Sequence, residues 1–124
     1  MVFTNAGAQQ LTWAIGSSIS NNYVQSIGIG SGSGTALVTN ATLLAEHTRA
    51  MQTGSPNFIT ARKITFQGDF NSAIMSGLTL TEFGLFRSGT VNIGSVWQRE
   101  AFGSLTFDGT NELQITTTLE IIPG

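Results

Sequence analysis

The stretch LQITTTLEI, residues 113–121, alternates between two kinds of side chain along its whole length. One set is Leu113, Ile115, Thr117, Leu119 and Ile121, and the other is Gln114, Thr116, Thr118 and Glu120. A repeat of two is the spacing of a β-strand whose faces meet different surroundings. The stretch therefore predicts a strand with its mainly aliphatic face on a core.

The same repeat recurs upstream. It predicts strands in FITARKITF (58–66) and LTLTEFGLF (78–86), with shorter candidates in SVWQREAF (95–102) and SLTF (104–107). An earlier strand, YVQSIGIG (23–30), places Ile27 and Ile29 on one face and small residues on the other, which allows close approach of another element. The turn-forming sequences GDFNS, RSGT and FDGTN separate the later strands, and Asp108–Gly109 is a signal for a tight turn.

One helix is expected, at the start of the chain. Thr4 or Asn5 can cap it, apolar residues then recur at helical spacing through residues 8–15, and Gly16 is a plausible end. The stretch ATLLAEHTRAM (41–51) could form one or two further helical turns.

These elements predict an all-β, mainly antiparallel fold: a β-sandwich or a jelly-roll-like small barrel with a short N-terminal helix. A length of 124 residues is enough for one domain, residues 1–124.

The composition restricts the partners. Only 10% of the residues are charged, against about a quarter in typical proteins, and the net charge is −2 with no basic run. We therefore expect no binding to nucleic acid or to an anionic membrane. The chain has no cysteine, and no signal peptide or membrane span is predicted, so folding in a cytoplasm is expected. A surface of hydroxyls, amides and glycines suggests a protein of an assembly.

The glycine-rich stretch SIGIGSGSGTA (26–36) raises the question of a nucleotide cofactor. A phosphate-binding P-loop needs Lys and then Ser or Thr after its last glycine, but Gly34 is followed by Thr35 and Ala36. The dinucleotide pattern fails as well, because its third glycine position is Ser33. The sequence therefore predicts a hairpin or crossover connection and no cofactor.

Catalytic chemistry has few candidates. His47 is the only histidine, and Glu46 beside it points away on either a helix or a strand. No further His or Cys could complete a metal site with His47, and no G-x-S-x-G nucleophile motif is present. The sequence predicts no catalytic, cofactor-binding or metal-binding residue, and His47 is expected at the surface or in an interface.

One charge is expected in the interior. Glu82 lies in the middle of a predicted strand, on the same face as Leu80 and Phe86, so it must be paired or lie at a sheet edge. Arg62, central in its own predicted strand, is the proposed partner in a structural ion pair.

The aromatic residues Trp13, Trp97 and Tyr23 could stack on sugars or bases. Because no basic residues flank them, packing in the core or in an interface is the favoured interpretation.

Five segments together carry a resemblance: FTNAG (3–7), IGIGSGSG (27–34), LLAEHTR (43–49), LTEFGLF (80–86) and LQITTTLEI (113–121). Their order resembles a family of small bacteriophage virion proteins, often described as tail-fibre or tail proteins, and covers nearly the whole chain. Glu46, Arg49 and Glu82 fall on the family's motif positions. The loop after Gly30 is plainer in Ser and Gly than the family's Pro- and Asp-containing loop. The resemblance implies a structural role in a phage particle without catalysis.

The expected function is that of a capsid decoration (cement) protein. It would bind the major capsid protein as a homotrimer in the virion, after assembly in the host cytoplasm. The expected interface residues are Glu46, His47, Arg49, Trp13 and Trp97. The alternatives are a tail-fibre, collar or tail-tip component, a carbohydrate-binding module that stacks sugars on Trp97 or Trp13, and, least favoured, an enzyme that uses Glu46 and His47.

Overall fold

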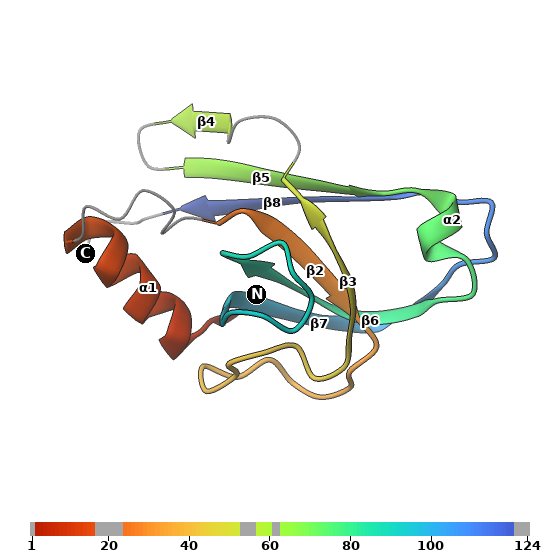
Figure 1. Cartoon of the computed structure of the whole chain (residues 1–124), viewed down its shortest axis with the longest axis horizontal. Coiled ribbons are helices and arrows are strands. Elements are labelled where there is room, and N and C mark those ends of the chain that lie inside the picture. The colour runs from red at the N-terminus through yellow and green to blue at the C-terminus, as the bar shows by residue number, and fades with distance from the viewer. Residues whose placement is uncertain (1, 17–23, 53–56, 61–62, 121–124) are drawn as a thin grey trace.

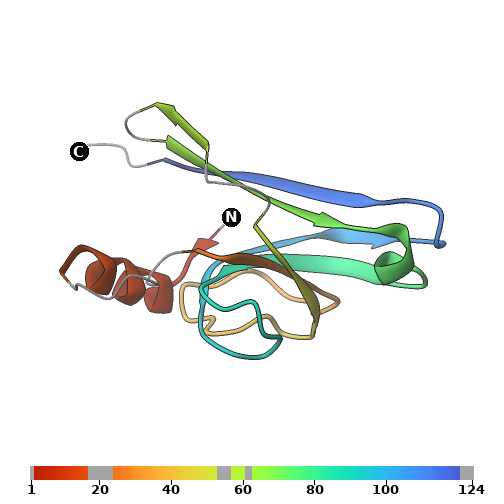
Figure 2. The ribbon, with the colours of Figure 1, turned by 45° about the horizontal axis from the view of Figure 1, so that its top comes forward.

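The chain folds into two antiparallel β-sheets that pack face to face, with a helix at one end (Figures 1 and 2). This computed structural model describes residues 2–16, 24–52, 57–60 and 63–120. The five-stranded sheet has the order β1 (Val2–Phe3), β7 (Val96–Thr106), β6 (Thr79–Phe86), β2 (Ser26–Gly30) and β3 (Glu46–Met51). The three-stranded sheet has the order β4 (Asn57–Thr60), β5 (Lys63–Phe70) and β8 (Leu113–Glu120). Neither sheet of the described residues closes into a barrel, so the fold is the sandwich rather than its barrel alternative.

The main core lies between the two sheets. Ile27 and Ile29 of β2 and Leu85 of β6 project from the five-stranded sheet toward Phe66 and Phe70 of β5. All five side chains are buried. The predicted alternation in 113–121 is confirmed over β8, where the face toward the core is more buried than the opposite face.

The N-terminal helix is also confirmed, as α1 (Asn5–Gly16). Thr4 is its cap: the hydroxyl oxygen of Thr4 accepts a hydrogen bond from the Gly7 amide at 2.9 Å. The helix lies close to β7, because a Cβ on Gly7 would stand 2.3 Å from the carbonyl oxygen of Trp97. The indole Nε1 of Trp97 donates to the Gln10 side chain at 2.8 Å, which fixes the helix against the strand.

The other face of the five-stranded sheet is covered by loops rather than by a third layer of regular structure (Figure 2). The first connection, residues 31–45, joins β2 to β3, and the second connection, residues 87–95, joins β6 to β7. The small face predicted for β2 lies on this side, where a Cβ on Gly28 would stand 2.7 Å from the Phe86 ring. Small residues there let the covering side chains approach the backbone of the sheet.

The helical turns predicted for residues 41–51 are wrong. Residues 41–45 are irregular, and β3 is a strand paired with β2. A short isolated helix is marginal in water. Pairing with the open edge of β2 instead satisfies the backbone of residues 46–51.

Three further boundaries differ from the prediction. FITARKITF is not one strand, because β4 ends at Thr60 and β5 begins at Lys63 to pair with it in the antiparallel sense. The two short candidates in residues 95–107 form the single strand β7. The predicted turn GDFNS is strand up to Phe70, after which Asn71 caps the short helix α2 (Ser72–Met75).

Candidate functional site

The most distinctive site is a charged centre on the loop-covered face of the five-stranded sheet. A register shift between Leu80 and Glu82 changes the direction of the side chains along β6. As a result, Leu80 packs in the core between the sheets, whereas Glu82 points under the first connection. The prediction that these two side chains share a face is therefore wrong, because a local irregularity interrupts the repeat of two.

The Glu82 carboxylate gathers four hydrogen-bond donors. Its Oε1 accepts from the amides of Gly32 at 3.2 Å and Ala45 at 2.9 Å. Its Oε2 accepts from the Leu44 amide at 3.1 Å and from Nε of Arg99 at 2.8 Å. One carboxylate thus fixes both ends of the first connection to the sheet. The glycine-rich stretch does present an N–H group to an anion, and that anion is a side chain of the same protein.

The Arg99 guanidinium completes this set of contacts. We call Glu82, Arg99 and the hydrogen bonds by which they hold the first connection the first clamp. Arg99 lies beside Glu82 because β7 pairs with β6 in a register that places Arg99 opposite Gly84. Its Nη1 also donates to the Gly34 carbonyl at 3.4 Å and to Oδ1 of Asn40 at 3.3 Å. Both charged side chains are wholly buried, so the pair depends on this complete set of partners.

Burial by itself raises the pKa of the Glu82 carboxyl, because it disfavours the charged form. Hydrogen bonds from the amides of Ala45 and Leu44, together with the hydrogen bond and charge of Arg99, outweigh it. The pKa of Glu82 is therefore held below its ordinary value of 4.5. The carboxylate is stabilised in its ionised form.

Arg62, the expected partner of Glu82, lies outside the described residues. The cation that forms an ion pair with Glu82 is Arg99. The sequence did contain a signal for Arg99. The two strands joined by RSGT are consecutive, and pairing them as a hairpin brings Arg99 near residues 82–84.

A second clamp holds the second connection. Arg49 on β3 binds Glu46 through Nε at 2.5 Å and through Nη2 at 3.0 Å. Its Nη1 donates to the carbonyls of Ser88 at 2.8 Å and Ile93 at 2.7 Å. The guanidinium lies 3.5 Å from the ring centre of Phe86, in a cation–π contact. The side chains of Glu46 and Arg49 are almost completely buried.

These contacts change the expected interface. The side chains of Glu46 and Arg49 are not available at the surface, because they bind each other in the second clamp and are almost completely buried there. Trp97 is only 4% exposed and belongs to the core. His47 is exposed on β3, as predicted. Trp13 lies in α1, but its side chain is outside the described part of the structure.

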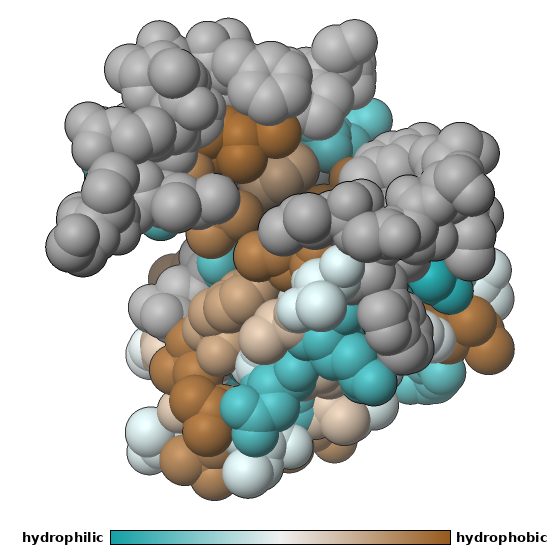
Figure 3. All heavy atoms as spheres, turned by 90° about the vertical axis from the view of Figure 1, so that its left-hand side faces the viewer, coloured by the Kyte–Doolittle hydropathy of each residue, from teal (hydrophilic) through white to brown (hydrophobic). Residues whose placement is uncertain are grey.

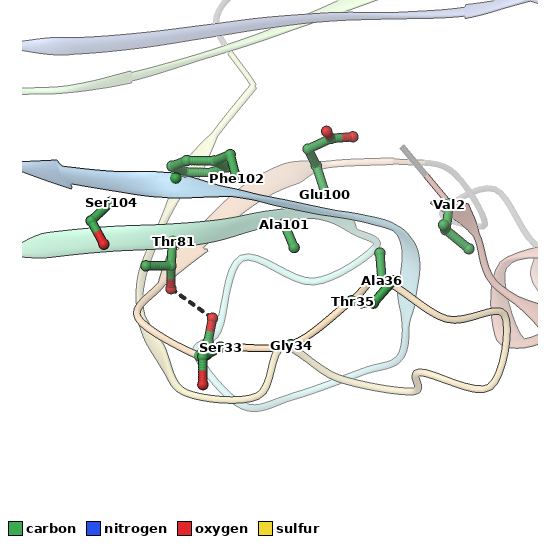
Figure 4. Close-up of a pocket in the computed structure, with 12 residues that line it drawn as sticks. Val2, Ser33, Gly34, Thr35, Ala36, Thr81, Glu100, Ala101, Phe102 and Ser104 are labelled. Carbon is green, nitrogen blue, oxygen red and sulfur yellow. Dashed lines mark hydrogen bonds between the residues drawn. The ribbon is translucent and has the colours of Figure 1, made fainter.

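A groove of about 780 Å³ follows β7 beyond the end of β1 (Figure 4). Residues 32–36 of the first connection form one wall, and residues 100–104 of β7 form the other. The Thr81 hydroxyl donates to the Gly32 carbonyl at 2.6 Å and secures the loop at this groove. In the close-up, Thr81, Ala101 and Ser104 point toward the first connection, whereas the Glu100 carboxylate and the Phe102 ring project from the other side of β7 (Figure 4).

Apolar side chains also reach the surface. Seen from the end where α1 lies, they are interspersed with polar ones among the described residues (Figure 3). Among the residues whose side chains the structure describes, the large apolar side chains that are about half exposed are Leu37, Val38, Leu44, Met51, Ile74, Ile93 and Leu105. Four of them lie on the two connections.

Within the described residues, no group of three or more His, Cys, Asp or Glu side chains could hold a metal ion. No helix in this part of the chain is long and apolar enough to cross a membrane. In comparisons with protein-family models, with curated proteins and with solved structures, nothing matched the chain.

Proposed function

We propose that the protein is a structural component of a bacteriophage particle, and specifically a decoration protein on the outer shell. The observation that carries the proposal is the meeting of the resembling segments at one carboxylate. IGIGSGSG supplies Gly32, LLAEHTR supplies Leu44 and Ala45, and LTEFGLF supplies Glu82. Segments that lie far apart in the sequence thus form one architectural unit, and this common structural role of the motif residues supports the proposal of a structural protein.

The second clamp supports the same proposal. Glu46 and Arg49, the charged residues of LLAEHTR, bind each other and hold the second connection. The charged residues of the motifs are therefore used to fix loops on a rigid sandwich. That use suits a protein whose task is to present a constant surface.

A decoration protein stabilises a shell because it adds contacts that exist only on the assembled particle. A compact sandwich with 10% charged residues is suited to being covered by neighbouring subunits. Its surface hydroxyls and amides can be desolvated at a lower free-energy cost than charged groups.

The carbohydrate-binding alternative is weakened by the position of Trp97. Its ring is 4% exposed, and its Nε1 is occupied by Gln10. A sugar needs an accessible aromatic face for stacking, and Trp97 does not offer one.

The deciding measurement is the copy number of the chain in purified particles of the phage that encodes it, by quantitative mass spectrometry against the shell protein. We expect about one copy per shell subunit, because only a shell offers that many equivalent sites. A handful of copies would make the protein a tail component, and its absence from the particle would overturn the proposal.

A further inference from the structure

We infer that β7 accepts an additional strand along the part of its edge that β1 leaves open. The strand is an extended segment of another protein of the phage particle, and it lies antiparallel to β7, in line with β1. The inference rests on the proposed function for the source of this segment. It deepens that function by assigning the binding site and the chemistry that recognises the partner.

The first observation is that the strand on the outer edge of β7 stops early. β1 pairs with β7 only at Gln98 and Arg99, whereas β7 continues to Thr106. Beyond Arg99, no strand of the described residues pairs with this side of β7. The residues of β7 are buried up to Arg99 and are exposed from Gly103 onward. An open strand edge is a template on which another polypeptide can pair.

The second observation is the direction of the backbone groups of Ala101. The Thr4 amide donates to the Trp97 carbonyl at 2.9 Å, so Trp97 presents its backbone groups on the side of β1. In a strand the N–H and C=O groups of every second residue point to the same side, which gives Arg99 and then Ala101 this direction. Val2 lies opposite Arg99, but among the described residues none lies opposite Ala101 on that side. The N–H and C=O of Ala101 are therefore the donor and acceptor that an added strand would use.

The third observation is the groove between this part of β7 and residues 33–36, into which Ala101 and Ser104 point (Figure 4). Residues directly opposite each other in antiparallel strands have their side chains on the same face, so the residue paired with Ala101 would enter the groove. Apart from Glu100, whose carboxylate projects from the other side of β7, the lining residues are uncharged. A charged side chain there would lose hydration without a counterion, so the segment carries an uncharged residue at this position.

The wall of the groove is fixed before a segment arrives. The Thr81 hydroxyl donates to the Gly32 carbonyl at 2.6 Å, and Nη1 of Arg99 donates to the Gly34 carbonyl at 3.4 Å. A preformed site loses less conformational entropy on binding than a loop that must first be ordered. In strand addition the main-chain hydrogen bonds supply affinity, and the groove selects the side chain that enters it.

The experiment adds purified protein at increasing concentration to particles assembled without this chain. The test variant is Ala101→Pro, which removes the N–H at the open edge. Because that N–H points away from β6, its loss removes no hydrogen bond between β6 and β7, and proline is tolerated at such a position. The matched control is Ala101→Gly, which also weakens a strand but keeps the N–H. Circular dichroism and thermal melting establish whether each variant folds.

A second pair of variants tests the groove and decides the matter if Ala101→Pro does not fold. Ser104→Arg places a long charged side chain on an exposed residue that lines the groove. Thr116→Arg is its control, because Thr116 is an exposed residue of β8 in the other sheet.

We expect each folded test variant to bind at least about tenfold more weakly than the parent, and each control to bind within about twofold of it. The amide of Ala101 should also exchange hydrogen at least about tenfold more slowly on the particle than in the free protein. Undiminished binding by a folded test variant, equal loss in a test variant and its control, or unchanged exchange at Ala101 would overturn the inference while leaving the proposed function in place.

Two other outcomes count against the inference differently. If the purified parent forms dimers that Ala101→Pro disrupts, the edge of β7 pairs with a second copy of the chain and the inference is wrong. If the folded parent does not bind the particle at all, the proposed function fails together with the inference.

Discussion

Nε of Arg99 lies 2.8 Å from Oε2 of Glu82, and neither side chain has any surface exposed to solvent. Glu82→Gln removes the negative charge and leaves a buried guanidinium without its counterion. We expect a loss of about 3–5 kcal/mol in the free energy of unfolding, measured by urea denaturation. A loss below about 1 kcal/mol would show that the pair is solvated in solution.

A double-mutant cycle distinguishes the energy of the Glu82–Arg99 ion pair from the energy of the amide hydrogen bonds that Glu82 also accepts. We expect Glu82→Leu/Arg99→Leu to be more stable than the sum of the two single losses predicts, by at least about 1 kcal/mol. The double variant should still be less stable than the parent, because the amides of Gly32, Leu44 and Ala45 lose their acceptor. Additive losses would contradict a direct coupling.

The stability of the fold should decrease in acid. Because the pKa of Glu82 is lower in the folded protein than its ordinary value of 4.5, its contribution is fully present above pH 4.5 and is lost as the pH falls through the folded pKa. Denaturation at a series of pH values should show this decrease in the parent and a smaller one in Glu82→Gln. Asp108→Asn serves as the control. The pKa of Asp108 is lowered too, in its case by hydrogen bonds from Thr110, but the Asp108 carboxylate is exposed.

Gly32→Ala tests how closely the first connection packs. An added Cβ would stand 2.4 Å from Cβ of Leu44 and 2.6 Å from Oε1 of Glu82, so the loop must shift. We expect a loss of about 1–3 kcal/mol by thermal melting. Gly103→Ala is the matched control, because nothing lies within 4 Å of its added Cβ, and it should change stability by less than about 0.5 kcal/mol.

Glu46→Gln should loosen the second clamp without unfolding the sandwich. Arg49 then loses its charged partner, and its hold on Ser88 and Ile93 weakens. Hydrogen exchange followed by mass spectrometry should show faster exchange confined to residues 87–95. His47→Ala, on the exposed neighbour, should leave the exchange pattern of the parent unchanged. Equal protection of residues 87–95 in Glu46→Gln would mean that the clamp does not order this loop.

The regular elements could be predicted because their signals are local. The alternation in β8 and the Thr4 cap of α1 each need only neighbouring residues. Helical turns were predicted for residues 41–51 because Leu44 with His47 or Thr48 would share one face of a helix, whereas residues 46–51 form the strand β3. Glu46 and Arg49 are three residues apart, a spacing at which the side chains of a regular strand point to opposite sides. In the structure, a register shift within the pairing of β2 with β3 brings them to the same side of a strand.

The charged centre could be predicted only in part. The need for a partner on Glu82 follows from its position in a strand. The identity of that partner depends on the register between β6 and β7, which contains two shifts. The donors from the first connection depend on how an irregular segment of chain folds back over the sheet, and no local pattern encodes that path.

The first clamp also has a consequence for how the sequence can diverge. A side chain at position 30 or 32 would collide with Oε1 of Glu82. Any change at Glu82 leaves the buried Arg99 without its counterion. These four positions therefore form a co-dependent set, in which a single substitution is harmful unless others accompany it. Among homologous sequences, Gly30, Gly32, Glu82 and Arg99 should be inherited or replaced together, while residues 35–39 between the fixed ends vary in length and composition.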